Sequence, residues 1–222
     1  AAVAGISSAD VGTLDTAEVQ ALGTDIANMG SAAMAALTSA QLGAMTTDQI
    51  AALGSEDTAA LSSAALAGMT SAQVAALTTT QLAKMATDDL NAITTAQISA
   101  LTTAQVSNLT TAQLAGMSVK QVAAMETDDL SVLTTAQVRA LSTAQVVSIT
   151  TEQLQVLSTQ QINGLSTAQM LALTTSQIAA LTTAQALGLS TANANALSTA
   201  QIVALLTDDV AVLTTTDLRA LS

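Results

Sequence analysis

The hexapeptide LTTAQV at residues 101–106 decides the fold, because it returns almost unchanged along the chain. It recurs as LTTAQL at 109–114, LTTAQV at 133–138 and LSTAQI at 197–202. Each copy places two hydroxyl residues after an aliphatic residue and follows them, one residue later, with a glutamine. A repeat of eight residues therefore organises the sequence, and its chemistry has to explain the paired hydroxyls and the glutamine.

The repeat keeps a strict register. Counting back from Leu221 in steps of eight meets Leu, Ile or Met at every step as far as Met29. The next step, to Leu22, is seven residues, after which the step of eight resumes. We number each octad T-T-A-Q-V-x-x-L as positions one to eight. This register predicts a single continuous array over 1–222, of about 27 octads, with a one-residue deletion in the unit 23–29.

Two apolar positions, five and eight, recur in every octad. A continuous α-helix does not fit, because eight residues overshoot two turns by ~80° and the apolar stripe would wind around the helix. A β-solenoid does not fit either, because positions five and eight would point to opposite faces of a strand. The conflict disappears if each octad is a separate helix of ~6 residues followed by a bend, which places both positions on one face.

The hydroxyl and the glutamine then form a capping box. Ser, Thr and Asp are preferred N-caps, and in S/T-x-x-Q the glutamine bonds back to the capping residue. Position one is the expected cap. Position two is even more regular, since it is Ser or Thr in every octad except at Val119. It is therefore either the true cap in many octads or a residue whose hydroxyl bonds to a neighbouring octad. A third possibility is that it forms a surface for ice or a glycan.

One octad alone has too little apolar surface to fold, so the octads must stack on one another. We therefore predict an all-α protein, an α-solenoid superhelix of very short helices with one helix per octad. The sequence leaves the number of octads in each superhelical turn open.

Composition excludes several functions. The net charge is −12, and the basic residues are only Lys84, Lys120, Arg139 and Arg219, so a nucleic acid partner is not expected. The sequence contains no run of ~18 to 20 apolar residues, so no membrane span is predicted. The chain has no His and no Cys, which removes nitrogen and sulfur metal sites and the usual pairs of nucleophile and base. We expect no enzyme activity.

A longer period of 40 residues overlies the octads. ATDDL at 86–90, ETDDL at 126–130 and LTDDV at 206–210 are separated by 40 and 80 residues, and TTDQI at 46–50 precedes the first by 40. Five octads thus form a higher unit. It indicates either duplication of a 40-residue block or a superhelix that presents similar faces at that interval.

The acids of this longer unit are the only candidate ligands. Paired carboxylates supply the oxygen atoms that Ca²⁺ prefers. The alternative is that they lie in a first helical turn, where negative charge meets the positive end of the helix dipole. We favour this alternative and predict no metal and no cofactor. The candidates are Asp88, Asp89, Asp128, Asp129, Asp208 and Asp209.

Both ends of the sequence lie within repeat. The first residues, AAVAGISSADVGTL, carry no initiator Met, no basic region and no cleavage pattern. The last, TTTDLRALS, stop inside an octad without a distinct capping sequence. We infer a processed chain or a segment of something longer, whose ends could stack on another copy. Self-association into a homo-oligomer or filament is therefore expected.

The tandem string LTTAQVxAL resembles the octapeptide-repeat regions of very large, repetitive bacterial secreted and surface proteins, including long adhesin-like chains. The resemblance covers essentially the whole sequence. It implies a structural or adhesive role outside the cell or at its surface, with the array as a stalk or filament, and it implies no catalytic residues.

Two functions follow as hypotheses. The first is a non-enzymatic structural protein, an extracellular rod, stalk or self-associating filament. The second is a ligand-binding surface, as in an ice-binding protein or a carbohydrate adhesin, which would use the regular row of Thr methyl and hydroxyl groups. The second requires that row to be exposed and flat.

Overall fold

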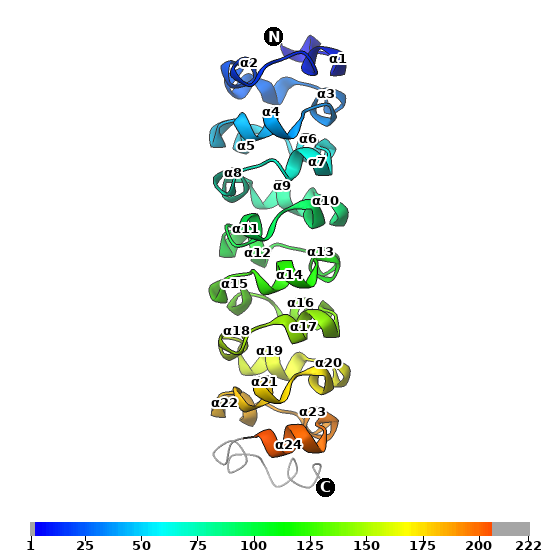
Figure 1. Ribbon diagram of the computed structural model, residues 1–222, viewed down its shortest axis with the longest axis vertical. Coiled ribbons are helices and arrows are strands. Elements are labelled where there is room, and N and C mark those ends of the chain that lie inside the picture. The colour runs from blue at the N-terminus through cyan, green and yellow to red at the C-terminus, as the bar shows by residue number, and fades with distance from the viewer. Residues whose placement is uncertain (1–2, 206–222) are drawn as a thin grey trace. The chain divides into compact units, whose positions relative to one another are not determined.

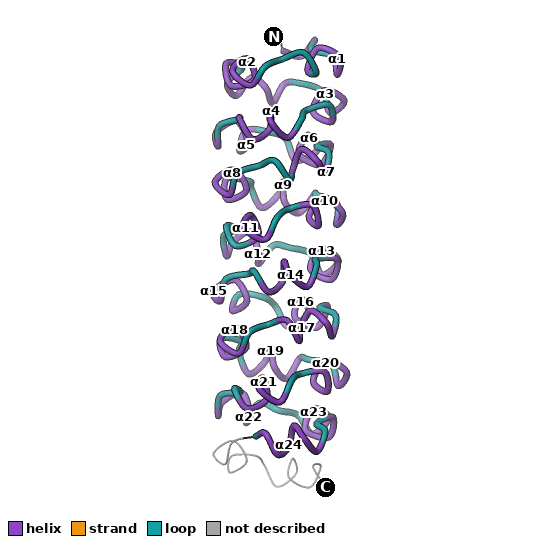
Figure 2. The backbone as a smooth tube through the Cα atoms, viewed as in Figure 1, coloured by secondary structure: helices purple, strands orange, loops and turns teal. Residues whose placement is uncertain are grey.

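The octads fold into short helices joined by short bends (Figure 1). A computed structural model describes residues 3–205, and within that range the secondary structure is helical, with no strand (Figure 2). This confirms the predicted helical solenoid with one helix per octad. The chain divides into two compact units, Ala1–Met117 and Ser118–Ser222. The octad register of the sequence does not change at this boundary.

The first unit contains two 3-10 helices, η1 and η2, and thirteen α-helices. In chain order they are η1 (Val3–Gly5), α1 (Ser8–Val11), α2 (Thr16–Ala21), η2 (Gly23–Asn28), α3 (Ser31–Ala35), α4 (Ser39–Ala44), α5 (Thr47–Ala52), α6 (Ser55–Ala60), α7 (Ser63–Leu66), α8 (Ser71–Ala76), α9 (Thr79–Lys84), α10 (Thr87–Ala92), α11 (Thr95–Ile98), α12 (Thr103–Ser107) and α13 (Thr111–Gly116).

In the second unit the described helices are all α-helices. They are α14 (Val119–Ala123), α15 (Thr127–Ser131), α16 (Thr135–Ala140), α17 (Thr143–Ser148), α18 (Thr151–Gln155), α19 (Thr159–Gly164), α20 (Thr167–Ala172), α21 (Thr175–Ala179), α22 (Thr183–Leu187), α23 (Thr191–Ala196) and α24 (Thr199–Ala204).

The bends use ordinary extended backbone at positions eight and one. Between α8 and α9, Leu77 has φ −58° and ψ 136°, and Thr78 has φ −72° and ψ 155°. Any residue can adopt these angles, which is why the repeat needs no glycine or proline at its corner. Among the described residues, positive φ occurs only at Gly23.

Positions five and eight form the core of each unit. Val106 and Leu109 of α12 and its bend are buried, as are most of their counterparts along the described chain. Those that are only partly buried lie near the two ends of the described range and are Ile6, Leu14, Leu22 and Ile202. Thr58, Ala186 and Ala194, where position five is not a large aliphatic residue, are buried as well. The packing of successive turns therefore buries position five whatever residue type occupies it. The methionines at position eight fill this core.

Successive turns contain between three and four octads. Within each unit a helix packs on the helix three places later, as α6 does on α9 and α14 on α17. Side-chain hydrogen bonds reach one octad further, from Gln105 of α12 to Val74 of α8. These two intervals set the number of octads per turn, which the sequence left open.

The shortened octad folds as the 3-10 helix η2. A 3-10 helix rises ~2.0 Å per residue against ~1.5 Å in an α-helix, so fewer residues cover the same length. Gly23, with φ 55°, opens it in the left-handed region that favours glycine. η2 still packs on α5, as a full octad would. The deletion is thus absorbed by a change of helix type.

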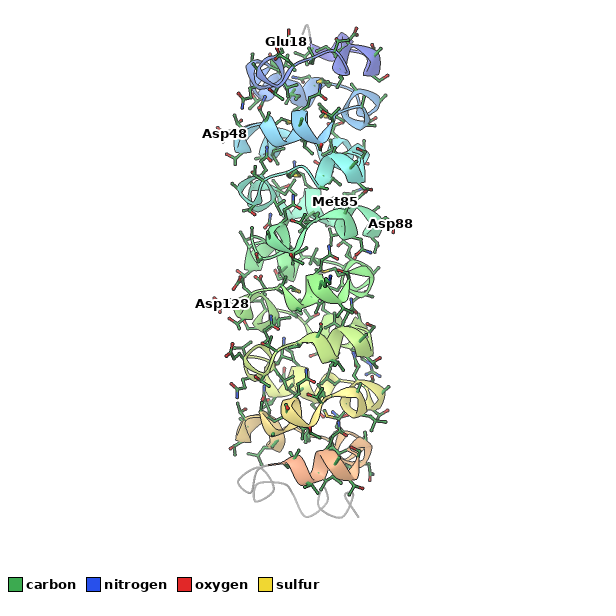
Figure 3. The ribbon with its side chains drawn as sticks, viewed as in Figure 1. Glu18, Asp48, Met85, Asp88 and Asp128 are labelled. Carbon is green, nitrogen blue, oxygen red and sulfur yellow. The ribbon has the colours of Figure 1, made fainter. Side chains whose placement is uncertain are left out.

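The 40-residue period does not align one face of the array. Within the first unit, Asp48 and Asp88 point outward on opposite sides (Figure 3). Five octads make more than one turn but fewer than two, because a turn contains between three and four octads. The interpretation that the superhelix presents similar faces at this interval therefore does not hold for Asp48 and Asp88, and duplication of a 40-residue block stays a prediction.

Candidate functional site: the buried glutamine ladder

Position one is the helix cap, as predicted. In α12 the Thr102 backbone N–H donates to Gln105 Oε1 at 2.7 Å, and the Gln105 N–H donates to Thr102 Oγ1 at 3.2 Å. The same capping box starts most of the helices. The alternative, that position two is the true cap, is wrong, because position two is already the first helical residue. The α-helices without the full box are α3, α6, α7, α10, α15 and α23.

The same glutamine makes a second set of bonds to an octad four places earlier. Gln105 Nε2 donates to the carbonyl oxygens of Val74 and Leu77, at 2.9 and 2.7 Å. We call the glutamines that bond in this way the glutamine ladder. Its further members are Gln41, Gln49, Gln73, Gln81, Gln97 and Gln113 in the first unit and Gln153, Gln161, Gln169, Gln177, Gln185 and Gln201 in the second.

These bonds satisfy groups that a short helix leaves open. The last carbonyl groups of an α-helix have no intrahelical partner, and in a helix of one or two turns they are most of its acceptors. The position-eight carbonyl lies at that end, and the position-five carbonyl, which already accepts from the position-eight N–H of its own octad, gains a second donor. One buried glutamine therefore caps the N-terminus of its own helix and the C-terminal carbonyls of another. Gln161, for example, is 3 % exposed and uses both ends of its amide.

The sequence couples the two halves of the box. Wherever position one is neither Ser nor Thr, position four is not Gln. This coupling is expected if the glutamine must be oriented by the cap before its amide can reach the earlier turn. The pairs are Asp15 with Glu18, Gly23 with Asp25, Gly30 with Ala33, Gly54 with Asp57, Ala86 with Asp89, Glu126 with Asp129 and Leu206 with Asp209.

Position two faces the neighbouring turn. A Cβ added at Gly116, a position-seven residue, would run into the methyl group of Thr87, 29 residues earlier. Elsewhere the position-two hydroxyl donates across turns, from Ser63 Oγ to Asp89 Oδ1 at 2.8 Å and from Ser71 Oγ to the Ala96 carbonyl at 3.1 Å. The second hydroxyl of the repeat is therefore a lateral contact residue, which agrees with the second alternative from the sequence.

In the first unit, the candidate aspartates begin α10. Asp88 is exposed at position three, and Asp89 is half-buried at position four, where it accepts the bond from Ser63. Neighbouring residues on a helix point in different directions, so the two carboxylates do not converge on one point. Asp89 takes the place of a ladder glutamine but has no amide to donate.

In the second unit, Asp128 and Asp129 begin α15 in the same way. Asp128 is exposed, whereas Asp129 is 2 % exposed and its Oδ2 has no hydrogen-bond partner. Burial raises the pKa of Asp129 to about 6, and the nearby charges of Glu126 and Asp128 add to this, while a hydrogen bond from the Glu126 backbone opposes it. The other two candidates, Asp208 and Asp209, lie outside the described residues.

Within residues 3–205, no three acidic side chains lie close enough together to hold a metal ion. In the same range no helix is long and apolar enough to cross a membrane. In the two described pairs, Asp88 with Asp89 and Asp128 with Asp129, the first residue is exposed and the second is partly or fully buried.

The ladder is the feature that sequence reasoning missed. A capping box works with either Glu or Gln at its fourth position. In this chain, however, the octads that begin with Ser or Thr have Gln there in 16 of 20 cases and Glu in none. That preference for an amide was the available signal, because only the amide has an N–H left to donate once its oxygen is bound to the cap. Its acceptors could not be identified without the turn geometry.

Comparison with known families supports the repeat. Five overlapping stretches match the family model described as the ALTTAQ repeat, over residues 24–55, 50–87, 82–119, 122–159 and 146–183. No curated protein matches the chain.

Proposed function

Because the chain belongs to the ALTTAQ repeat family, we propose that it is a non-enzymatic structural segment that acts outside the cell or at its surface as a rod, stalk or filament. The observation that carries this proposal is the glutamine ladder. In each unit it ties successive turns together through buried hydrogen bonds, which is a mechanical rather than a chemical arrangement.

The ladder bonds oppose extension of the array. Each joins residues 26 to 31 apart in sequence, so pulling adjacent turns apart must break them together with the apolar contacts of positions five and eight. A buried amide bonded to two carbonyls is costly to expose without replacement partners. Stacked turns held in this way suit a segment that sets a distance or bears a load.

The surface supports a passive role. Positions one, two, three and six are mostly exposed and are occupied mainly by Ser, Thr and Ala, with few charges. The extracellular placement rests on the resemblance of the tandem LTTAQV string to secreted and surface repeat proteins.

Single-molecule stretching of the whole chain tests the load-bearing role. We expect extension in steps that each release one or a few turns, with recovery on relaxation, because neighbouring turns stabilise one another. A Gln161→Glu chain should yield at lower force than a Gln160→Glu chain, which carries the same charge on the exposed face of α19. Extension without measurable resistance would overturn the proposal.

Surface placement has its own test. Antibodies against the repeat should label intact cells of the source organism as strongly as permeabilised ones. Labelling that requires permeabilisation would exclude the extracellular role while leaving the mechanical one untouched. Ice or carbohydrate binding is the competing function, and clear thermal hysteresis or glycan-array binding by the purified chain would favour it. Capping engages the position-one hydroxyls, so a ligand-binding row would have to use the exposed hydroxyls of position two.

A further inference from the structure

Two successive octads of the second unit, 182–189 and 190–197, have alanine at position five, Ala186 and Ala194. Elsewhere in the described part of that unit, position five is Val, Leu, Ile or Met. Both alanines are buried. A side chain stabilises the fold in proportion to the apolar area that it removes from water, and a single methyl group removes little. These two octads therefore gain less from position five than the other described octads of the unit.

The second of these octads also lacks the ladder glutamine. Its position four is Asn193, whose Nδ2 donates to the carbonyl oxygens of Ile162 and Asn163 at 3.4 and 3.3 Å. These distances are at the long limit of hydrogen-bond geometry. In the preceding octad, Gln185 Nε2 donates to the carbonyl oxygen of Leu154 at 2.7 Å. The amide bonds from α23 to the earlier turn are thus longer than those from α22.

The cap of α23 is completed from the earlier turn. Ser190 Oγ accepts from the Asn193 backbone N–H at 3.2 Å, but the return bond of the capping box is not formed. The Ser190 backbone N–H donates instead to Oδ1 of Asn163, 27 residues earlier, at 3.0 Å. In the preceding octad the corresponding N–H, that of Thr182, donates to Gln185 of the same octad. Asn163 therefore supplies the oxygen that glutamine supplies in a regular octad.

This replacement bond lies at the surface. Asn163 is an exposed position-six residue of α19, whereas the ladder glutamine Gln185 is buried. Water can replace a hydrogen bond at an exposed site, so breaking it costs less than exposing a buried amide that finds no new partner. The polar attachments of α23 to the earlier turn are therefore easier to break than those of a regular octad.

The next octad is attached independently of α23. Gln201 of α24 donates to the carbonyl oxygens of Met170 and Leu173, at 3.1 and 2.7 Å, in α20 and its bend. α24 also packs on α21. When α23 detaches, the octads 198–205 and 166–173 therefore stay bonded to each other, and only the contacts of one octad are lost.

We propose that residues 190–197 form an opening segment, which detaches from the array before the neighbouring described octads, and that Asn163 holds it closed. Segments with few buried apolar contacts and exposed hydrogen bonds open locally at a lower free energy than the rest of a fold. Under tension the opening segment releases the length of one octad while Gln201 keeps the flanking octads joined. That consequence rests on the proposed load-bearing function, whereas the opening itself takes place without load.

Hydrogen exchange of the whole chain, read by mass spectrometry of its peptides, tests the opening segment. The backbone amides of 190–197 should exchange about tenfold faster, or more, than those of 166–173 and those of 198–205. Equal exchange in 190–197 and 166–173 would overturn the proposal. Exchange in 198–205 as fast as in 190–197 would overturn it too, because the loss of contacts would then not be confined to one octad. Failure of the load-bearing function in stretching experiments would leave these rates unchanged.

A double-mutant cycle tests the role of Asn163. Asn163→Ala should speed exchange of the opening segment about fivefold, because the Ser190 N–H loses its acceptor. Asn193→Gln should slow exchange. In that background Asn163→Ala should change the rate less than about twofold, because the new amide oxygen can accept from the Ser190 N–H. The matched control, Asn195→Ala at the exposed position six of α23, should not speed exchange. An equal effect of Asn163→Ala in both backgrounds would refute the role of Asn163.

Discussion

Replacing a ladder glutamine by glutamate isolates the contribution of its amide. In Gln161→Glu the side chain keeps an oxygen for the Ser158 N–H, which now lies 2.6 Å from Gln161 Oε1. It loses the Nε2 donor bonds to the carbonyls of Leu130 and Leu133, at 3.1 and 2.6 Å. Gln160, the preceding residue of α19, is exposed, so Gln160→Glu adds the same charge without touching the ladder.

The expected cost can be worked from these contacts. Two lost hydrogen bonds contribute about 1 kcal/mol each. Enclosing a carboxylate adds about 2 kcal/mol, if burial raises its pKa by about as much as it does at Asp129, at ~1.4 kcal/mol per pH unit with a discount for residual hydration. At pH 7 the total is about 4 kcal/mol. At pH 4.5 the glutamate is largely protonated and donates one bond again, so the cost falls to about 1 kcal/mol. Gln160→Glu should stay within ~0.5 kcal/mol of wild type.

Urea unfolding followed by far-ultraviolet circular dichroism measures the difference, since the chain has no Trp or Tyr for fluorescence. Arrays of repeats need not unfold in one step, so hydrogen exchange of peptides spanning 130–165 provides the local readout. A difference of less than ~1 kcal/mol at pH 7 between the free energies of unfolding of Gln161→Glu and Gln160→Glu would contradict the role of the amide. A cost of Gln161→Glu that is the same at pH 4.5 as at pH 7 would contradict it as well.

Three further changes have defined outcomes. Gly116→Ala should destabilise the first unit by ~1 to 3 kcal/mol in urea unfolding, because the new methyl meets that of Thr87, and adding Thr87→Ser should recover part of the loss. The folded-state pKa of Asp129 is raised to about 6 from 3.8, so the folded chain binds this proton more tightly than the unfolded chain. Its stability should therefore decline as pH rises from ~4 to ~6 and stay lower above that. Asp129→Asn should remove that part of the pH dependence, and an unchanged profile would contradict the assignment. Asn193 only reaches carbonyls at 3.3 and 3.4 Å, so Asn193→Gln should raise the free energy of unfolding by ~1 kcal/mol, whereas Asn195→Gln, on the exposed face of α23, should not.

The helix caps, the short helices and the bends could be predicted from the sequence, because the hydrogen bonds that form the caps join residues only three apart. The capping pair Thr102 and Gln105, the helix that follows it and the bend at Leu109 all lie within one octad. The burial of positions five and eight follows from their spacing on that helix. The helical solenoid could therefore be predicted from one octad and its repetition. The shortened unit 23–29 was visible as a break in register, although its conversion to a 3-10 helix was not.

The partners of the glutamine amides belong to a different level of organisation. Gln105 bonds to Val74 and Leu77 because between three and four octads complete a turn. The rotation of the chain at each bend, added over successive bends, decides that number. A change of a few degrees per bend would bring a different octad into register, so no local pattern specifies the acceptors. For the same reason Asp48 and Asp88, identical in octad position, end on opposite sides of the first unit (Figure 3). The two hydroxyl residues of the repeat differ in the same way. The first caps its own helix, which one octad determines, whereas the second acquires its role only when a neighbouring turn packs against it.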